Sequence, residues 1–134
     1  MSVGFGDIIT AIKILHGAVE ILRARHGAEA EYANIIEDIE SYEGTLAHLQ
    51  HLKLGTQEQQ EVNVIIAQVQ RLMVTVREMH TTVDTHASCK ANTKRSMIHR
   101  TKWATKTSKK IEDYRKKLAN QSQSIKILLS SLNL

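Results

Sequence analysis

The stretch VNVIIAQVQRLMVTVREMHTTVDTH, residues 62–86, decides the fold class of this chain. Its large apolar residues recur alternately three and four positions apart, a spacing that places them on one face of an α-helix. They are Val62, Ile65, Val69, Leu72, Val76, Met79 and Val83, followed by His86. Neither proline nor glycine interrupts the stretch. We therefore predict one long helix over about residues 57–88.

Three other segments repeat the helical period. Residues 7–26 begin with Asp7, a good N-cap, and end before Gly27, a good helix stop. Residues 29–52 combine an apolar stripe with an acidic outer face, and residues 108–132 carry a fourth stripe. Gly44 lies inside the second segment, where it costs about 1 kcal/mol in helix propensity. It predicts either the close approach of a neighbouring helix or a bend.

The composition agrees with an all-helical protein. The chain has 134 residues, 42% of them hydrophobic, with no proline and six glycines, which argues against a turn-rich β-fold. Its length suits one domain over residues 1–134. We predict an all-α four-helix bundle with up-down-up-down topology. Between the third and fourth helices we expect a basic loop at 89–107, with a short extra helix near Thr93 to Thr101.

Charge is distributed unevenly along the chain. The formal net charge is +4, but residues 1–61 carry four basic and ten acidic side chains, whereas residues 62–134 carry fourteen basic and four acidic ones. Eleven of those fourteen basic residues lie between Lys90 and Lys117, where only two acidic residues oppose them. Such a concentration predicts an acidic partner or an acidic neighbour within the fold.

The basic segment has three interpretations. It could bind nucleic acid, lie on an anionic membrane with Trp103 as the interface anchor, or pack beside the acidic face of residues 29–52. Aromatic residues are too sparse for a base-stacking platform, so we do not expect nucleic acid as the partner. Trp103 could equally fold back and cap the bundle. The candidate cations for anionic lipid or an acidic partner are Lys94, Arg95, Arg100, Lys102, Lys106, Lys109, Lys110, Lys116 and Lys117.

Catalytic and metal-binding patterns are missing from the sequence. There is no phosphate-binding glycine loop, no nucleophile elbow and no H-E-x-x-H motif. His48 and His51 could supply two metal ligands, but no third or fourth is specified. Cys89 lies among lysines that would lower the pKa of its thiol, although an ordinary thiol is the simpler interpretation. We expect no catalytic residue, no metal, no cofactor and no enzymatic activity.

The sequence also bears on location. One cysteine cannot form an internal disulfide, which predicts a reducing, cytoplasmic environment. No secretory signal is visible. The most apolar stretch, Ile8 to Leu22, is interrupted by Lys13, His16 and Glu20, which makes it too short and too polar for a membrane span.

Two segments resemble a known family. They are MSVGFGDIITAIKI, residues 1–14, and RTKWATKTSKKIEDYRKKLANQSQSIKILLSSL, residues 100–132. With the spacing between them, they resemble the fungal HeLo-like domains that stand at the N-terminus of STAND (NLR-like) proteins. The glycine-containing start, the Lys-Trp pair and the pattern of the last helix carry the likeness. The matching positions in that last helix are Ile111, Tyr114, Arg115, Lys117, Leu118, Ser122, Ser124, Leu128 and Leu129.

The resemblance implies a non-enzymatic signalling or cell-death module at the start of a longer protein. Such domains are thought to oligomerise on activation and, in some members, to attack membranes through the first helix. Recruitment of a cytoplasmic protein to the inner face of the plasma membrane would follow. The alternative is an adaptor that binds a helix of another domain without membrane activity. The candidate membrane-inserting residues are Phe5, Ile8, Ile9, Ile12, Leu15, Val19 and Leu22.

Overall fold

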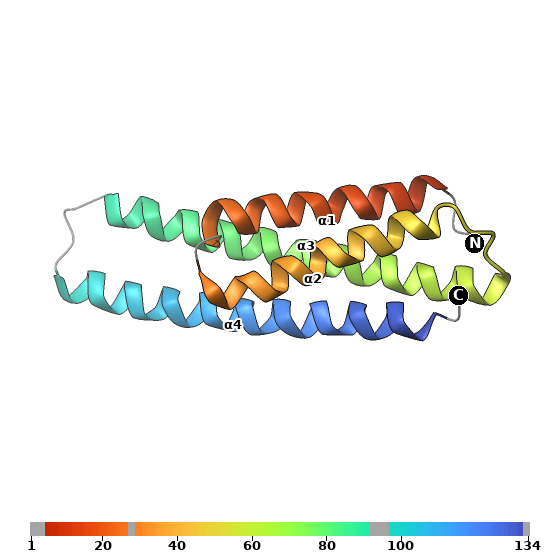
Figure 1. The fold of residues 1–134 in the computed structure, drawn as a ribbon. Helices are drawn as coiled ribbons and strands as arrows, with labels where there is room; N and C mark the ends of the chain where they lie inside the picture. Colours follow the sequence, from red (N-terminus) through yellow and green to blue (C-terminus); the bar gives the residue numbers. More distant parts are fainter. Residues whose placement is uncertain (1–4, 27–28, 92–96, 133–134) are drawn as a thin grey trace.

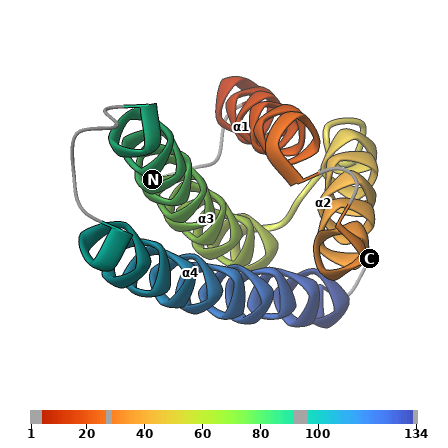
Figure 2. The same cartoon turned by 90° about the vertical axis from the view of Figure 1, so that its left-hand side faces the viewer.

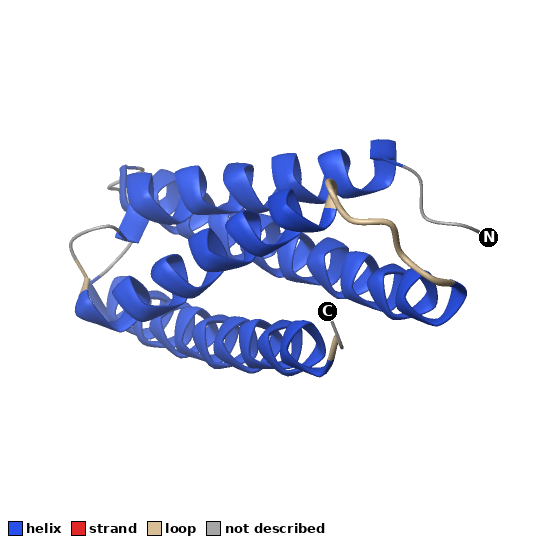
Figure 3. Cartoon of the chain, turned by 45° about the vertical axis from the view of Figure 1, so that its right-hand side comes forward, coloured by secondary structure: helices blue, strands red, loops and turns tan. Residues whose placement is uncertain are grey.

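All regular secondary structure is helical over the residues that a computed structural model of the chain describes. These are 5–26, 29–91 and 97–132, with side chains described except at 5–6, 25–26, 83–91 and 97–108. The helices are α1 (Phe5–His26), α2 (Ala30–Leu49), α3 (Thr56–Ala91) and α4 (Met97–Ser131). Over these ranges no strand occurs (Figure 3). The predictions of an all-α fold and of four helices are confirmed.

The helices differ in length, and this shapes the bundle. α3 and α4 have 36 and 35 residues, whereas α1 and α2 have 22 and 20. At 1.5 Å per residue, the longer pair spans roughly 53 Å and the shorter pair roughly 30 Å. α3 and α4 therefore continue past α1 and α2 at one end (Figure 1). We call this the α3–α4 end, where α3 ends at Ala91 and α4 begins at Met97.

The four helices are arranged around one core, in an order that differs from their order along the chain. Viewed from the end, α1 lies beside α2 and α3, and α4 lies beside the same two helices (Figure 2). Within the described ranges, the backbones of α2 and α3 stay apart although the two helices are consecutive, and side chains such as Tyr32 and Met79 meet across the core between them. The six residues 50–55 between them can span up to roughly 20 Å, which is enough to cross the diagonal of the bundle.

The core consists of the predicted apolar stripes. Large side chains with no exposed surface come from every helix, and they form one cluster. They include Leu15 and Leu22 of α1, Ile39 and Leu46 of α2, Ile65 and Leu72 of α3, and Leu118 and Ile125 of α4. All members of the α3 stripe from Val62 to Met79 are buried. The stripe that decided the fold class therefore lies in the interior.

The basic segment departs from the predicted loop. α4 begins at Met97, well before the expected start at Ser108, so residues 97–107 form the first turns of this helix. The separate helix expected near Thr93 to Thr101 overlaps α4, and residues 92–96 lie outside the described ranges. Polar composition suggested a loop, but no glycine or proline follows Gly55 in the sequence. Nothing in residues 97–107 therefore breaks a helix.

Gly44 also differs from expectation. It is exposed within α2, and a Cβ added there would have no atom within 4 Å. The close approach of a neighbouring helix is therefore not the reason for this glycine.

Candidate functional site

The apolar side chains proposed to enter a membrane lie mainly inside the bundle. Ile8, Leu15, Val19 and Leu22 are buried, with at most 4% of their surface exposed. Ile12 and Ile9 complete the described set, the former partly buried and the latter 40% exposed. The side chain of Phe5 lies outside the described part. In this conformation the apolar stripe of α1 is used by the core, and its entry into a membrane would require α1 to leave the bundle.

Polar pairs close the edge between α1 and α2. The guanidinium of Arg23 donates a hydrogen bond to Glu40 of α2 and forms an ion pair with it. His16 of α1 lies 3.1 Å from Glu20 through Nε2 and 3.8 Å from Glu43 of α2 through Nδ1. We call these five residues the α1–α2 seam. Basic groups of α1 thus contact acidic groups of α2, and these acidic groups belong to the acidic segment 29–52.

Glu43 is the least solvated member of the seam. Its side chain is 22% exposed, and its Oε1 atom is buried and accepts no hydrogen bond within the described part. Burial raises the pKa of this carboxyl above its ordinary value, and neighbouring Glu40 adds to the rise, while His16 and Arg23 oppose it. Ionised Glu43 is therefore under-compensated, since burial of a charge is unfavourable without full pairing.

The described cations of the basic segment form a separate feature on the outside of α4. Lys109, Lys110, Lys116 and Lys117 are all exposed. Seven positions separate the two pairs, so they lie two turns apart on one face of the helix. None of them forms an ion pair within the part of the chain whose side chains are described. We call these four residues the lysine face.

The other predicted basic residues cannot be placed by side chain. Arg100, Lys102 and Lys106 lie in the first turns of α4, as does Trp103, but their side chains are outside the described part. Lys94 and Arg95 lie outside the described residues altogether.

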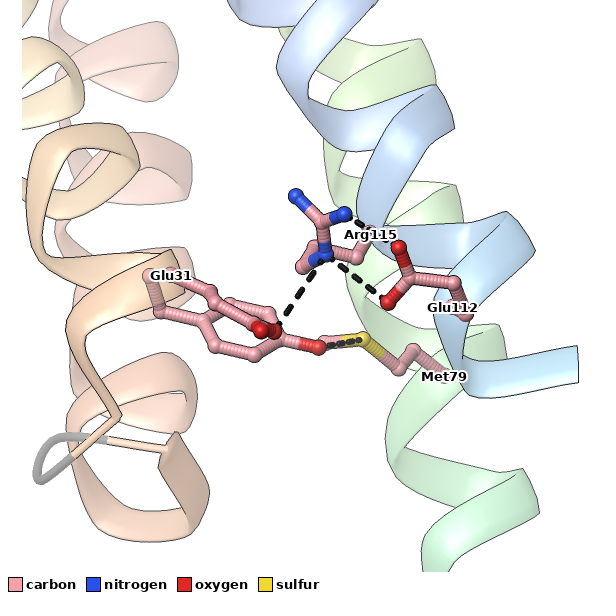
Figure 4. A network of polar contacts seen from close by, with 5 residues as sticks. Glu31, Met79, Glu112 and Arg115 are labelled. Carbon is pink, nitrogen blue, oxygen red and sulfur yellow. Dashed lines mark hydrogen bonds and ion pairs between the residues drawn. The ribbon is translucent and has the colours of Figure 1, made fainter. Parts of the chain in front are cut away.

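Arg115 was not among the predicted binding residues, yet it joins the two charged helices. Its guanidinium forms an ion pair and hydrogen bonds with Glu112 one turn earlier in α4 (Figure 4). Its Nε atom also lies 3.5 Å from Glu31 of α2. These contacts lower the pKa of Glu112, mainly through the hydrogen bond from Arg115. One cation of the basic segment thus faces the acidic helix, whereas the lysine face does not.

Two tyrosines tie α2 to its neighbours from inside the core. The Tyr42 hydroxyl donates to the Ser122 carbonyl oxygen of α4 at 2.7 Å and lies 3.1 Å from its Oγ. The Tyr32 hydroxyl lies 3.6 Å from the sulfur of Met79 in α3 (Figure 4). Burial is the main cause that raises the pKa of Tyr32, to about 12. In the sequence, only the positions of Tyr32 and Tyr42 in an apolar stripe indicate that they are buried. That spacing does not identify the partner of either hydroxyl.

Two surface grooves accompany the helix pairs. The α2–α4 groove has a volume of about 320 Å³ and is lined by Asp38, Ser41, Tyr42, Thr45, Lys126, Leu129 and Ser130. The α3–α4 groove has a volume of about 370 Å³ and is lined by Val74, Arg77, Glu78, Thr81, Thr82 and Tyr114.

The described residues contain no cluster of three or more histidine, cysteine or acidic side chains suited to a metal ion. Among the helices as described, none is both long and apolar enough to cross a membrane. Searches of family models, curated proteins and solved structures found no match to this chain.

Proposed function

We propose that this chain is a non-enzymatic signalling domain, of the type used in programmed cell death and innate immunity, which self-associates at an anionic membrane surface. The observation that carries the proposal is the lysine face. Four exposed ammonium groups without ion pairs in the described part are concentrated on two turns of one helix. Each lysine near an anionic bilayer contributes about 1 kcal/mol of attraction. The resemblance to HeLo-like domains of STAND proteins supports the same class of function.

The sequence around the lysine face adds to this charge. Residues 83–110 contain eight lysines and arginines against a single acidic residue, Asp84. Those that the structure describes, 83–91 and 97–110, belong to the α3–α4 end, where two helices continue beyond the other two (Figure 1). A projecting basic end can approach a membrane without steric hindrance from α1 and α2. This arrangement favours membrane contact through the α3–α4 end.

Membrane insertion by α1 is the second step of the proposal. Ile8, Leu15, Val19 and Leu22 each gain roughly 1.5–3 kcal/mol from burial, so exposing all four to water would cost roughly 6–12 kcal/mol. That cost is comparable to the whole stability of a small domain. Release of α1 is therefore feasible only where a bilayer or other copies of the chain bury these side chains again. Electrostatic recruitment must come first.

The topology we propose is up-down-up-down. It is supported by the positions of the helix ends, because α1 and α3 end, and α2 and α4 begin, toward one side of the bundle, whereas α2 ends and α3 begins at the opposite side (Figure 1). In such a topology α1 is packed against α2 and α3 and not against α4, so its separation from the bundle breaks two helix contacts.

Co-sedimentation with vesicles tests the recruitment step. Wild-type chain should bind phosphatidylcholine vesicles containing phosphatidylserine at low salt, and phosphatidylcholine alone weakly or not at all. Replacing Lys109, Lys110, Lys116 and Lys117 by glutamine should weaken binding by about 30-fold or more, because two to four contacts of about 1 kcal/mol are lost. Binding should also decrease as the salt concentration rises.

A matched control separates the lysine face from net charge. The variant with glutamine at Lys13, Lys53, Arg71 and Arg77 removes the same number of exposed positive charges from other surfaces. It should retain most of the wild-type affinity. Equal losses in the two variants, or no vesicle binding by the wild type at low salt, would overturn the proposal.

The alternative function is a protein-interaction adaptor that docks a partner helix. The α3–α4 groove favours it, because Val74 on its rim is 51% exposed and could contact an apolar ridge. The vesicle experiment discriminates between the two. A chain with no affinity for anionic vesicles at low salt, but with a saturable protein partner whose binding is weakened by Val74→Glu, is an adaptor.

A further inference from the structure

The outward side of α4 continues beyond the lysine face. Ile127 follows Lys109 by eighteen positions and Lys116 by eleven, which correspond to about five and about three turns of an α-helix. These three residues therefore lie close to one line along α4. Leu118, nine positions before Ile127, is about two and a half turns away and completely buried. The line through Lys109, Lys116 and Ile127 thus points away from the core.

Ile127 is the most exposed large hydrophobic side chain in the described part, at 59%. A single exposed isoleucine is ordinary on a protein surface, so its exposure alone indicates no partner. The informative feature is its alignment with the exposed lysines. One side of α4 thereby combines positive charge with an apolar side chain, while the opposite side is buried in the core.

The charge along α4 becomes uniformly positive toward Ile127. The acidic residues of this helix are Glu112 and Asp113, and no acidic residue follows them in the chain. Glu112 is paired with Arg115, and Asp113 is exposed within the lysine face. Ile127 itself directly follows the exposed Lys126. A negative surface lying along α4 therefore meets one carboxylate of this helix at the lysine face and none at Ile127.

We propose that α4 lies lengthwise on an anionic bilayer with Ile127 inserted among the headgroups as an apolar anchor, and this inference rests on the membrane recruitment in the proposed function. A bilayer offers negative phosphates with an apolar layer beneath them. The lysine face is attracted to the phosphates, and Ile127 reaches the apolar layer from the same side of the helix. Interfacial helices combine basic and apolar side chains in this way.

The length of α4 distinguishes this orientation from contact through the α3–α4 end alone. Lys109 and Ile127 are roughly 27 Å apart along the helix axis. If α4 stood upright with only the α3–α4 end on the bilayer, Ile127 would remain in water. If α4 lies flat, both residues reach the surface together. Within the described ranges α1 packs against α2 and α3 and not against α4, so this contact leaves α1 in place (Figure 2).

A fluorescent label at position 127 tests the insertion. The complete chain with Cys89→Ser and Ile127→Cys has a single thiol, which can carry an environment-sensitive label such as nitrobenzoxadiazole. Its emission should shift to the blue when vesicles of phosphatidylcholine and phosphatidylserine are added at low salt. Ala33→Cys in the same background is the control, because Ala33 is exposed on α2 and its label should stay in water. Equal shifts at both positions, or no shift at position 127, would overturn the inference.

Vesicle affinity gives a second, independent readout. Ile127→Gln should weaken binding about three- to tenfold, because apolar surface no longer leaves water when the chain binds. The loss should be the same at low and moderate salt, since no charge changes, whereas Lys109→Gln should reduce the salt dependence.

Two further variants serve as controls for this loss of affinity. Ile127→Leu should restore wild-type binding. Val64→Gln changes a 49% exposed apolar residue of α3 and should leave binding unchanged. Wild-type affinity in Ile127→Gln, or equal losses in the two glutamine variants, would contradict the inference.

These measurements separate the orientation of α4 from recruitment itself. If the wild type sediments with anionic vesicles while a label at position 127 stays in water, recruitment stands and the lengthwise orientation is wrong. If the wild type does not sediment at low salt, the recruitment step and this inference both fail.

Discussion

The apolar face of α1 and the lysine face of α4 were both predicted to meet a membrane, but the fold treats them differently. Leu15 and Leu22 are completely buried between α2 and α3, whereas Lys109 and Lys116 are exposed on the outside of the bundle. The apolar residues of α1 are already buried in the core, whereas the lysines of α4 are accessible to a partner. The difference sets an order, in which charge attraction operates on the folded bundle and apolar contact requires the bundle to open.

The largest expected effect comes from truncating a buried side chain of α1. Leu15→Ala should lower the free energy of unfolding by about 2–5 kcal/mol, because it removes buried methyl groups and leaves a cavity. Urea denaturation followed by circular dichroism measures the loss. Ile9→Ala, at a position of the same helix that is 40% exposed, is the control and should cost less than about 1 kcal/mol. Similar costs at both positions would mean that α1 is not packed as described.

A smaller effect tests the buried hydrogen bond between α2 and α4. Tyr42→Phe removes the hydroxyl that donates to the Ser122 carbonyl oxygen, and should destabilise the chain by about 1–2 kcal/mol. Tyr114→Phe is the matched control, since this partly buried phenol has no hydrogen bond within the described part. Vesicle binding should not change in either variant, because the lysine face is intact. A loss of vesicle binding in Tyr42→Phe would show that membrane binding depends on how α4 packs against α2.

The smallest effect concerns the α1–α2 seam and depends on pH. Burial raises the pKa of Glu43 above 4.5, so the folded state binds this proton more tightly than the unfolded chain does. Stability from this group is therefore lost as the pH rises from about 4.5 through the raised value. Glu43→Gln removes the charge, and should be more stable than wild type at pH 7 by several tenths of a kcal/mol to about 1 kcal/mol.

Denaturation of wild type and Glu43→Gln between pH 4 and pH 8 checks the direction of this effect. The difference in free energy of unfolding in favour of Glu43→Gln should grow as the pH rises. Glu37→Gln changes an exposed carboxylate of the same helix and should show no such trend. An advantage that shrinks on raising the pH would mean that ionised Glu43 stabilises the seam through His16 more than burial opposes it.

Much of the interior could be predicted from the sequence, whereas the pairs of helices that pack against each other could not. The stripe from Val62 to Met79 is buried as its spacing indicated. In contrast, nothing in the spacing indicated that the backbone of α2 would approach α1 and α4 closely and stay apart from that of α3. Apolar stripes resemble one another chemically, so periodicity identifies the inner face of a helix without identifying the helix that covers it.

The basic segment shows the same division. Its charge was evident, but residues 97–107 were expected in a loop because they are polar, and they belong to α4. Arg115 and Lys116 are adjacent in sequence, yet Arg115 turns toward Glu31 and Lys116 toward solvent. A helix rotates successive side chains by about 100°, so neighbouring residues reach different surroundings. Which of them meets an acid depends on the position of α2.

The sequence by itself determined the helical class, the inner face of each helix and the separation of acidic from basic segments. These properties follow from local periodicity and composition, which need no knowledge of distant contacts. Only the tertiary structure decided that α2 lies beside α4, that Tyr42 meets Ser122, and that Asp38 and Lys126 face each other across an open groove. Those placements depend on how the four apolar stripes pack together, and packing joins residues that lie far apart in the chain.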